Sequence, residues 1–252
     1  MVVGEGAVFF LMLLIGLWKI RSAIRKEFEL SQRQNNFLLS VTHELKTPIA
    51  ANKLYLQTIQ KRNPDEEMRI DLLNKALKEN QRWEHLIDNI LNAARVENRA
   101  LQPIKESVDL NHFINTLVVQ FRKRYPTATI EVLHAPHKTV HFDVFMIETV
   151  LSNLVDNAVK YSQDKAHINI NASLTDTQVL LTVYDFGIGI KQEDQAAIFS
   201  KFYRIGNEET RTQKGSGLGL FIAQEFLRLH GGSIQYQQNT PKGSIFKLNL
   251  PV

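Results

Sequence analysis

The residues with the clearest chemical potential in this 252-residue chain are His43, Glu44 and Thr47. Read as helix, the stretch from Phe37 to Pro48 places its apolar residues along one stripe and leaves His43 facing solvent. Glu44 adjoins the histidine and Thr47 lies one turn further on, so the three side chains share one polar neighbourhood. A carboxylate that holds one ring N–H leaves the other nitrogen as a nucleophile. A surface histidine on a helix would show the same pattern, so a second site is needed to assign a function.

A second group of chemically useful residues lies on a helix predicted at 144–161. Four polar residues fall on neighbouring turns of one side, namely Asn153, Asn157, Lys160 and Tyr161. The side-chain carbonyl of an asparagine can bind Mg²⁺, and a lysine ammonium can reach phosphate. The pattern fits a magnesium and phosphate site, and it also fits an ordinary amphipathic helix.

The segment from Asp185 to Gly189 follows a predicted strand and includes Gly187. Glycines let the backbone approach a flat ring closely, and a buried aspartate can accept a hydrogen bond from the amino group of adenine. The segment is therefore a candidate nucleotide site. A plain glycine-containing turn from strand to helix has the same composition.

A glycine-rich segment opens the last predicted helix, and its residues are Gly215, Gly217, Leu218 and Gly219. Backbone N–H groups at a helix start can hold phosphate, although this segment matches neither the dinucleotide fingerprint nor the Walker motif. The polar segment 200–213 before it is long enough to form a lid. Arg204 and Arg211 within this segment suit phosphate, and each also suits a solvated surface.

Two long helices must position the histidine. The first is predicted to run to about Arg62, and the second carries apolar residues at spacings of three and four from Leu72 to Ala94. Between them, an N-cap at Asn63, a proline and acidic residues mark a short turn. The two helices should form an antiparallel hairpin that leaves one face uncovered. We expect a second copy to cover that face in a dimeric four-helix bundle; packing against the chain's own second domain is the alternative.

The remaining sequence predicts a separate domain of strands and helices. Residues 101–107 break the helical pattern and mark the boundary. After it, helices at 109–123, 144–161 and 218–229 are interleaved with strands at 130–133, 139–142, 168–174, 178–184, 233–237 and 244–250. This order predicts an α+β sandwich with helices on one face of a mixed sheet. We divide the chain into an apolar helix, a helical linker, the hairpin and the α+β domain, at 1–20, 21–36, 37–100 and 106–252.

The mostly apolar residues 1–20 are predicted to form a transmembrane helix, although the apolar run is shorter than the about 20 residues that span a bilayer. Trp18 is a candidate interfacial anchor, and Arg21, Arg25 and Lys26 place the C-terminal side in the cytoplasm. A cleaved signal or a buried helix is the alternative. Since so little sequence precedes the run, we expect the natural protein to be longer, or this chain to be a truncated form.

Composition excludes several classes of function. The chain has no cysteine, which rules out disulfides, thiol catalysis and cysteine–zinc sites. The net charge is +4, and no long basic run carries interleaved aromatics, so we predict no nucleic-acid binding. His134, His137 and His141 have a loose metal-like spacing, but they flank a proline and a strand, and we interpret them as surface histidines.

Together these segments resemble the sensor histidine kinases of two-component systems. In that family the pattern S-x-x-H-E-L-[KR]-[TS]-P surrounds the phospho-accepting histidine, and the match here is unbroken from Ser40 to Pro48. The three later segments resemble, in order, the family's N box, its D-x-G-x-G box and its second glycine box. Phe199 and Phe202 resemble its F box. The order and spacing of these boxes cover both predicted domains.

The resemblance implies a role for each group of residues. His43 would accept the phosphoryl group, Glu44 would orient its ring, and Thr47 would help to position water for a phosphatase reaction. Asn157 would bind Mg²⁺, and Asp185 would read adenine. The other ATP-binding positions that the resemblance implies are Asn153, Lys160, Tyr161, Gly187, Gly189, Arg204, Arg211, Gly215, Gly217, Leu218 and Gly219.

The implied protein is a homodimeric sensor histidine kinase that uses ATP and Mg²⁺ and passes its phosphoryl group to an aspartate in the receiver domain of a response regulator. It would also be a regulator phosphatase, and it would lie in the bacterial inner membrane with residues 1–20 in lipid. One rival is an ATP-driven machine of the gyrase or chaperone kind, which needs a glutamate where this chain has Asn153. A second rival is a membrane adaptor that binds ATP or a partner without catalysis.

Overall fold

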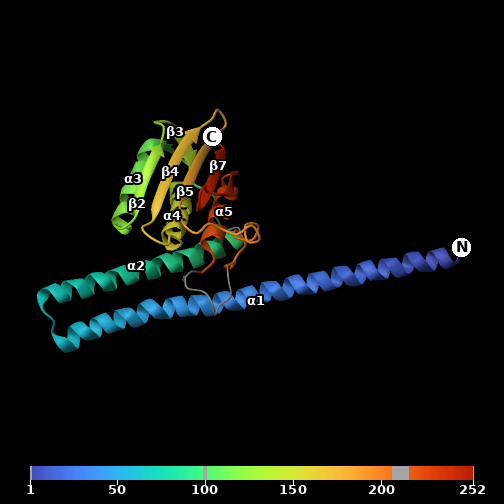
Figure 1. Cartoon of the computed structure of the whole chain (residues 1–252), viewed down its shortest axis with the longest axis horizontal. Helices are drawn as coiled ribbons and strands as arrows, with labels where there is room; N and C mark the ends of the chain where they lie inside the picture. The colour runs from blue at the N-terminus through green and yellow to red at the C-terminus, as the bar shows by residue number, and fades with distance from the viewer. Residues whose placement is uncertain (1, 99–100, 206–215, 252) are drawn as a thin grey trace.

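The computed structural model describes residues 2–98, 101–205 and 216–251, except for the side chains of residues 2–9, 33, 40 and 43. Two long helices form an antiparallel hairpin, and an α/β domain lies against the second half of the second helix (Figure 1). The helices are α1, Val2–Arg62, and α2, Glu66–Glu97. The predicted hairpin is therefore confirmed.

Helix α1 has 61 residues and continues through Pro48, which corresponds to a length of about 90 Å. The N-cap of α2 is Asp65, whose side chain accepts a hydrogen bond of 2.8 Å from the backbone N–H of Met68. The cap predicted at Asn63 is wrong by two residues. Asn63 instead adopts a positive φ of 43° in the turn, a conformation that asparagine tolerates better than most residues.

The first part of α1 projects beyond the hairpin (Figure 1). Its large apolar side chains from Phe10 to Ile24 are exposed. Within the part of the chain that the structure describes, no helix has a stretch long and apolar enough to cross a bilayer. The transmembrane helix predicted for residues 1–20 is thus unconfirmed.

The α/β domain contains a five-stranded sheet in the order β2–β4–β5–β7–β6. β2 and β4 are parallel, and the other neighbouring pairs are antiparallel, so the sheet is mixed as predicted. The strands are β2 Thr129–His134, β4 His167–Leu174, β5 Gln178–Asp185, β6 Ser233–Gln238 and β7 Ser244–Pro251.

A separate two-stranded sheet pairs β1, Glu106–Asp109, with β3, Thr139–Phe142. The domain boundary predicted across residues 101–107 overlaps β1, a strand that the sequence pattern does not predict. Three of the four β1 residues are exposed, so the strand lacks the alternation of apolar and polar residues that identifies a half-buried strand. Its register is set by a distant segment instead, with Glu106 opposite Phe142.

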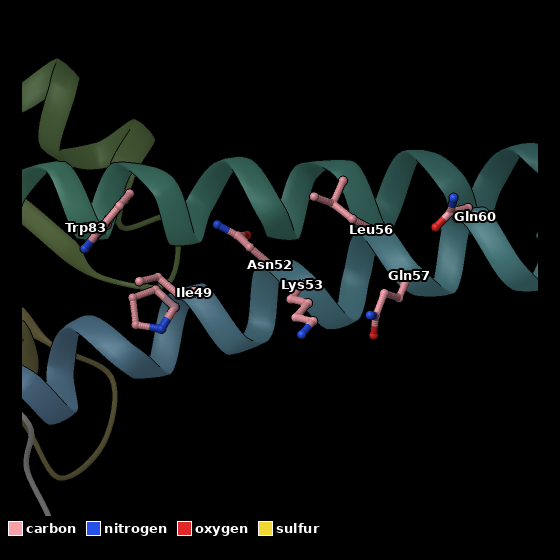
Figure 2. A pocket seen from close by; sticks show the side chains of 8 residues that line it. Ile49, Asn52, Lys53, Leu56, Gln57, Gln60 and Trp83 are labelled. Carbon is pink, nitrogen blue, oxygen red and sulfur yellow. The ribbon is translucent and has the colours of Figure 1, made fainter.

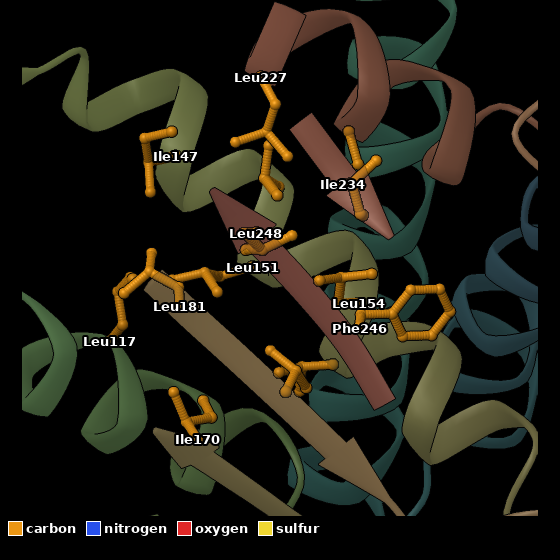
Figure 3. Close-up of a cluster of buried hydrophobic side chains, with 14 of the residues drawn as sticks. Leu117, Ile147, Leu151, Leu154, Ile170, Leu181, Leu227, Ile234, Phe246 and Leu248 are labelled. Carbon is orange, nitrogen blue, oxygen red and sulfur yellow. The ribbon is translucent and has the colours of Figure 1, made fainter. Parts of the chain in front are cut away.

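Three helices cover the inner face of the large sheet and enclose the core (Figure 3): α3 Leu110–Arg124, α4 Val144–Lys160 and α5 Gly219–Leu229. Alternate residues of the strands point into this core, as Leu181 and Leu248 do, and both are fully buried. Each large apolar side chain that is removed from water contributes about 1.5–3 kcal/mol. The predicted α+β sandwich is confirmed.

Helix α2 also contributes to this core through Ala93 and Val96, which are 2% and 7% exposed. The hairpin thus packs partly against the chain's own second domain, as the alternative to pairing with a second copy predicted. The opposite side of α2 keeps large apolar residues exposed, including Leu73, Leu77 and Leu91.

A buried polar contact joins the start of α4 to the end of α5. His230, at the end of α5, accepts a hydrogen bond of 3.0 Å from the backbone N–H of Asp143 through Nε2. Its Nδ1 lies 2.7 Å from the carbonyl oxygen of Phe226, so Nδ1 carries the proton and the ring is neutral. The Asp143 carboxylate caps α4 at Met146 and accepts from the backbone N–H of Ile104 at 2.8 Å.

This contact makes the stability of the domain sensitive to acid. Burial lowers the pKa of His230 in the folded chain, whereas the unfolded chain regains the usual value of about 6.5. The unfolded state therefore binds more protons as the pH falls through about 6.5, and folding stability decreases. At pH 7.5 the variant His230→Gln should be less stable than the wild type by about 1–3 kcal/mol in the free energy of unfolding. Between pH 7.5 and pH 5.5 its free energy of unfolding should fall by less than that of the wild type. Thermal unfolding at both pH values measures this; equal acid sensitivity of the two proteins would contradict it.

Candidate functional site

The structure places His43, Glu44 and Thr47 within one turn of α1. The side chain of His43 lies outside the described residues, and those of Glu44 and Thr47 are half-buried. Val41, two residues before the histidine, is buried, and Phe37 packs against the core of the α/β domain. The box therefore lies on a part of α1 that runs beside that domain.

Helix α4 positions the asparagines. Its apolar face, including Leu154 and Val155, is fully buried in the core and fixes the rotation of the helix. Asn153 is 5% exposed, and its Nδ2 has no hydrogen-bond partner within the described part of the chain. Asn157, one turn later, is half-buried. A buried amide that lacks a partner costs free energy, so Asn153 has a spare donor that a ligand could satisfy.

Asp185 ends β5 and is 7% exposed. Its Oδ1 accepts hydrogen bonds from the backbone N–H groups of Gly187 at 2.9 Å and Ser244 at 3.0 Å. Burial raises the pKa of the Asp185 carboxyl, and these two hydrogen bonds oppose the rise. The arrangement orients the carboxyl group and engages Oδ1 with the protein, which is the geometry that a reader of an exocyclic amino group needs.

The end of α4 and the segment after Asp185 are in direct contact. The carbonyl oxygen of Tyr161 accepts a hydrogen bond of 3.2 Å from the backbone N–H of Ile188. A Cβ at position 187 would lie 2.7 Å from the same oxygen, so only glycine allows this approach. Gly189 adopts a positive φ of 70°. Lys160 places its Nζ 4.8 Å from the centre of the Tyr161 ring.

The second glycine-rich segment joins the same site through Gly219, the first residue of α5. A Cβ there would lie 3.1 Å from Oδ1 of Asn153. Leu218 is fully buried and occupies the N-cap position of α5, so the helix begins one residue later than predicted. Gly217 has a positive φ of 70°, and a Cβ on it would lie 2.8 Å from the carbonyl oxygen of Tyr203. The structure thus brings the Asn153, Asp185 and Gly217 segments together.

Of three further predicted basic or glycine positions, the structure describes one. Arg204 is half-buried, and its Cγ would lie 3.1 Å from a Cβ at Gly217. Arg211 and Gly215 lie outside the described residues. The predicted F-box residue Phe202 stacks on Phe37 of α1, with ring centroids 4.0 Å apart.

The residues fit a magnesium ion that is held mainly by its substrate. Mg²⁺ prefers oxygen ligands and commonly uses one or two protein groups together with phosphate oxygens and water. Asn157 offers one amide oxygen on the half-buried face of α4. Among the described residues, no group of three or more acidic, histidine or cysteine side chains forms a metal site of its own. His134, His137 and His141 accordingly do not converge on one.

Sequence reasoning missed two parts of the site. Ser244 contributes a backbone N–H to Asp185, and Asn239 donates its side-chain amide to the carbonyl oxygen of Asp185 at 2.8 Å. Gly243 lies so close that a Cβ on it would be 2.1 Å from that carbonyl oxygen. Every residue except proline has a backbone N–H, so no residue type could have signalled the role of Ser244. The glycine in the predicted 240–243 turn was the one available sign.

The helical hairpin is of the kind that carries a phospho-acceptor, and the site on the α/β domain is of the kind that binds ATP. Comparison with known proteins agrees with both. Residues 33–99 match the His Kinase A (phospho-acceptor) domain. Residues 142–252 match the family described as histidine kinase-, DNA gyrase B-, and HSP90-like ATPase. The chain therefore carries a phospho-acceptor domain followed by an ATPase domain of this type, which fits a two-component sensor histidine kinase.

Individual relatives support the same family. The sensor protein CiaH of Streptococcus pneumoniae is 30% identical over 254 residues, which are 100% of this chain and 57% of CiaH. The histidine kinase AdeS of Acinetobacter baumannii matches with a TM-score of 0.59 and 27% identity over 83% of this chain and 97% of that structure. The histidine kinase ThkA, solved in complex with the response regulator protein TrrA, matches in fold with a TM-score of 0.60 and 24% identity over 90% of this chain and 64% of ThkA. The chain thus spans little more than half the length of its relative CiaH.

The close contact at Gly187 gives a test of the site geometry. Gly187→Ala should push a methyl group against the backbone oxygen of Tyr161, which cannot move without shifting the end of α4. We expect a loss of stability of about 1–3 kcal/mol and weaker binding of a fluorescent ATP analogue. Gly16→Ala is the matched control, because a Cβ at position 16 has no atom within 4 Å. Wild-type stability and affinity in Gly187→Ala would show that the two segments are not held together as described.

Proposed function

We propose that this chain autophosphorylates His43 from ATP and Mg²⁺ and passes the phosphoryl group to an aspartate of a response regulator. The observation that carries the proposal is the presence, in one chain, of a phospho-acceptor hairpin and an ATPase-type domain in which the Asn153, Asp185 and Gly217 segments lie together. A nucleotide site alone would fit many ATPases. The unbroken box around His43 gives this one an acceptor.

In the proposed reaction, one ring nitrogen of His43 attacks the γ-phosphorus of ATP in line with the bond to the bridging oxygen, which breaks to release ADP. Glu44 holds the second ring nitrogen and takes its proton as phosphohistidine forms. Asn157 would hold Mg²⁺, which when bound would neutralise the negative charge of the phosphates. Lys160 and Arg204 would contribute further positive charge, and Asp185 would orient the adenine.

Two observations favour this reaction over hydrolysis of the gyrase or chaperone kind. Such ATPases need a glutamate to activate water, and the corresponding position is Asn153. This asparagine is also buried against Gly219 and has no carboxylate to take a proton. The adaptor alternative requires a site that binds without reacting, and the intact His43 and Glu44 favour a catalytic role.

We also propose that the hairpin forms a homodimer through the side that faces away from the α/β domain. Residues of α1 and α2 line a groove of about 460 Å³ on the hairpin (Figure 2), and they are Pro48, Ile49, Asn52, Lys53, Leu56, Gln57, Gln60 and Trp83. Within the described chain, Trp83 Nε1 and Asn52 Oδ1 are buried and lack partners. Together with the exposed Leu73 and Leu77, this surface suits a second copy in a four-helix bundle. A regulator receiver domain is proposed to dock on the same bundle near His43.

Residues 1–20 are proposed to lie in the lipid of the bacterial inner membrane as a single pass, with the catalytic part in the cytoplasm. The support is the exposed apolar surface from Phe10 to Trp18. Basic residues Arg21, Arg25 and Lys26 follow it directly, which suits the cytoplasmic surface.

The primary test is incubation of the full chain with Mg²⁺ and ATP labelled at the γ-phosphate. The wild type should acquire a label that is stable to alkali and labile to acid, as phosphohistidine is. His43→Gln should acquire no label while it keeps its affinity for ATP, because the nucleotide site lies on other elements. Hydrolysis of ATP without any labelled protein would favour the ATPase alternative. Binding of ATP without either reaction would favour the adaptor.

The proposed phosphatase activity depends on Thr47, which lies one turn after His43 on α1. We expect Thr47→Ala to label itself at close to the wild-type rate but to dephosphorylate a phosphorylated regulator at least tenfold more slowly. Thr47→Ser keeps the hydroxyl and is the matched control, which should retain both activities. Equal loss of both activities in Thr47→Ala would contradict a separate role in the phosphatase reaction.

A further inference from the structure

A polar cluster outside the nucleotide site joins the hairpin to the α/β domain. Arg124, at the end of α3, places Nη1 2.9 Å from Nε2 of His85 on α2 and donates through Nη2 to Asp156 of α4 at 3.2 Å. Tyr125 donates its hydroxyl proton to the other oxygen of Asp156 at 2.6 Å. One guanidinium therefore links three helices, and one of them belongs to the other domain.

The contact between Arg124 and His85 requires a neutral histidine. A guanidinium has five donors and no acceptor, so Nε2 of His85 must be the acceptor and carry no proton. A protonated ring has only donors, and its positive charge would lie within hydrogen-bond distance of the Arg124 charge. Protonation of His85 thus converts an attractive contact into a repulsive one.

We propose that His85, Arg124 and Asp156 form a latch that positions the nucleotide-binding helix α4 against hairpin helix α2, and that this latch opens on acidification. The residue after Asp156 is Asn157, the proposed magnesium ligand. The latch does not depend on the proposed function, whereas its consequence for phosphoryl transfer does.

Electrostatics gives the pH range in which the latch should open. Burial lowers the pKa of His85, and Arg124 of α3 lowers it further, while Asp156 of α4 and Asp88 of α2 oppose the shift. When the domains separate, burial and Arg124 no longer act, and the pKa returns toward about 6.5. The separated state then binds more protons, so docking weakens as the pH falls through about 6.5.

A second attachment limits how far an open latch lets the domain move. Lys201 of the α/β domain forms an ion pair of 2.5 Å with Glu97 at the end of α2, and its ammonium lies 4.4 Å from the centre of the Phe202 ring. Phe202 has a positive φ of 65°, which is rare for an aromatic residue, and its ring stacks on Phe37 of α1. This attachment contains no histidine. Acid should therefore loosen the α4 side of the interface, where His85 lies, while this side stays attached.

The test measures the distance between the domains at different pH values. Because the chain has no cysteine, Lys78→Cys on α2 and Thr116→Cys on α3, both exposed, accept spin labels at two defined places. The labelled full chain is diluted with unlabelled chain so that only pairs within one protomer contribute. Pulsed spin resonance at pH 8 should give one narrow distance. Between pH 8 and pH 5.5, wherever circular dichroism shows the fold intact, the distribution should become broader and longer.

Variants separate the latch from a general effect of acid. His85→Gln keeps a neutral acceptor for Arg124, so its distance distribution should stay narrow at both pH values. Arg124→Gln removes the positive charge that pairs with Asp156 and also removes the contact with His85. Its distance distribution should therefore be broad even at pH 8. His134→Gln, an exposed histidine of β2, is the control and should respond to acid as the wild type does. Three results would each overturn the latch. The wild-type distance distribution could be the same at both pH values, that of His85→Gln could change with pH, or that of Arg124→Gln could be narrow at pH 8.

Labelling of His43 from γ-labelled ATP in the same samples keeps two failures apart. A pH-dependent distance without phosphohistidine would leave the latch in place and reject the proposed function. Phosphohistidine with a distance that does not respond to pH would leave the function in place and reject the latch.

Discussion

The close approach of α4 to the first turn of α5, at Asn153 and Gly219, is the constraint on which the rest of the site depends. The first helix ends at Lys160 and the second begins at Gly219, and the core beneath them holds their relative positions. Any side chain at 219 would meet the Asn153 amide, so glycine there sets the separation. The buried contact between Asp143 and His230 fixes the same pair of helices at their other ends. The nucleotide-type site is thus built between two helices that cannot slide independently.

Much of this arrangement could be predicted because it follows from the spacing of apolar and polar residues within short segments. Apolar residues at helical spacing identified α4 and its polar face, and alternation identified β4 and β5. Gly231, with a positive φ of 76°, follows α5 as expected of a residue that ends a helix. The candidate site residues were identified by resemblance to the boxes of a known family, since each pattern alone also fits an ordinary helix or turn.

The parts that could not be predicted depend on contacts between distant segments. Strand β1 exists because β3 lies opposite it, and its own residues carry no signal. The Ser244 hydrogen bond to Asp185 uses a backbone group common to nearly all residues. His85 and Arg124 are separated by 39 residues, and each alone is typical of a solvated surface. Their significance arises only when the fold places them together.

The two sides of hairpin helix α2 differ in what covers them. One side of α2, at Ala93 and Val96, is already buried by the α/β domain. The other side retains Leu77, Leu91 and the groove beside Trp83. A helix whose two sides are both apolar is stable in water only when both are covered. The side already covered is also the one that carries His85, so the docking of the domain and the proposed pairing of hairpins involve different residues and can vary separately.

Helix α4 connects this docking to the nucleotide site by geometry alone. Successive residues of a helix point about 100° apart, so Asp156 and Asn157 face different neighbours. Asp156 is bonded to Arg124 and Tyr125, and through Arg124 it reaches α2. The third side of the helix, with Leu154 and Ala158, is packed in a close-packed core that resists deformation. A force on Asp156 must therefore displace the helix together with the core behind it, and Asn157 moves with the whole domain relative to the histidine on α1.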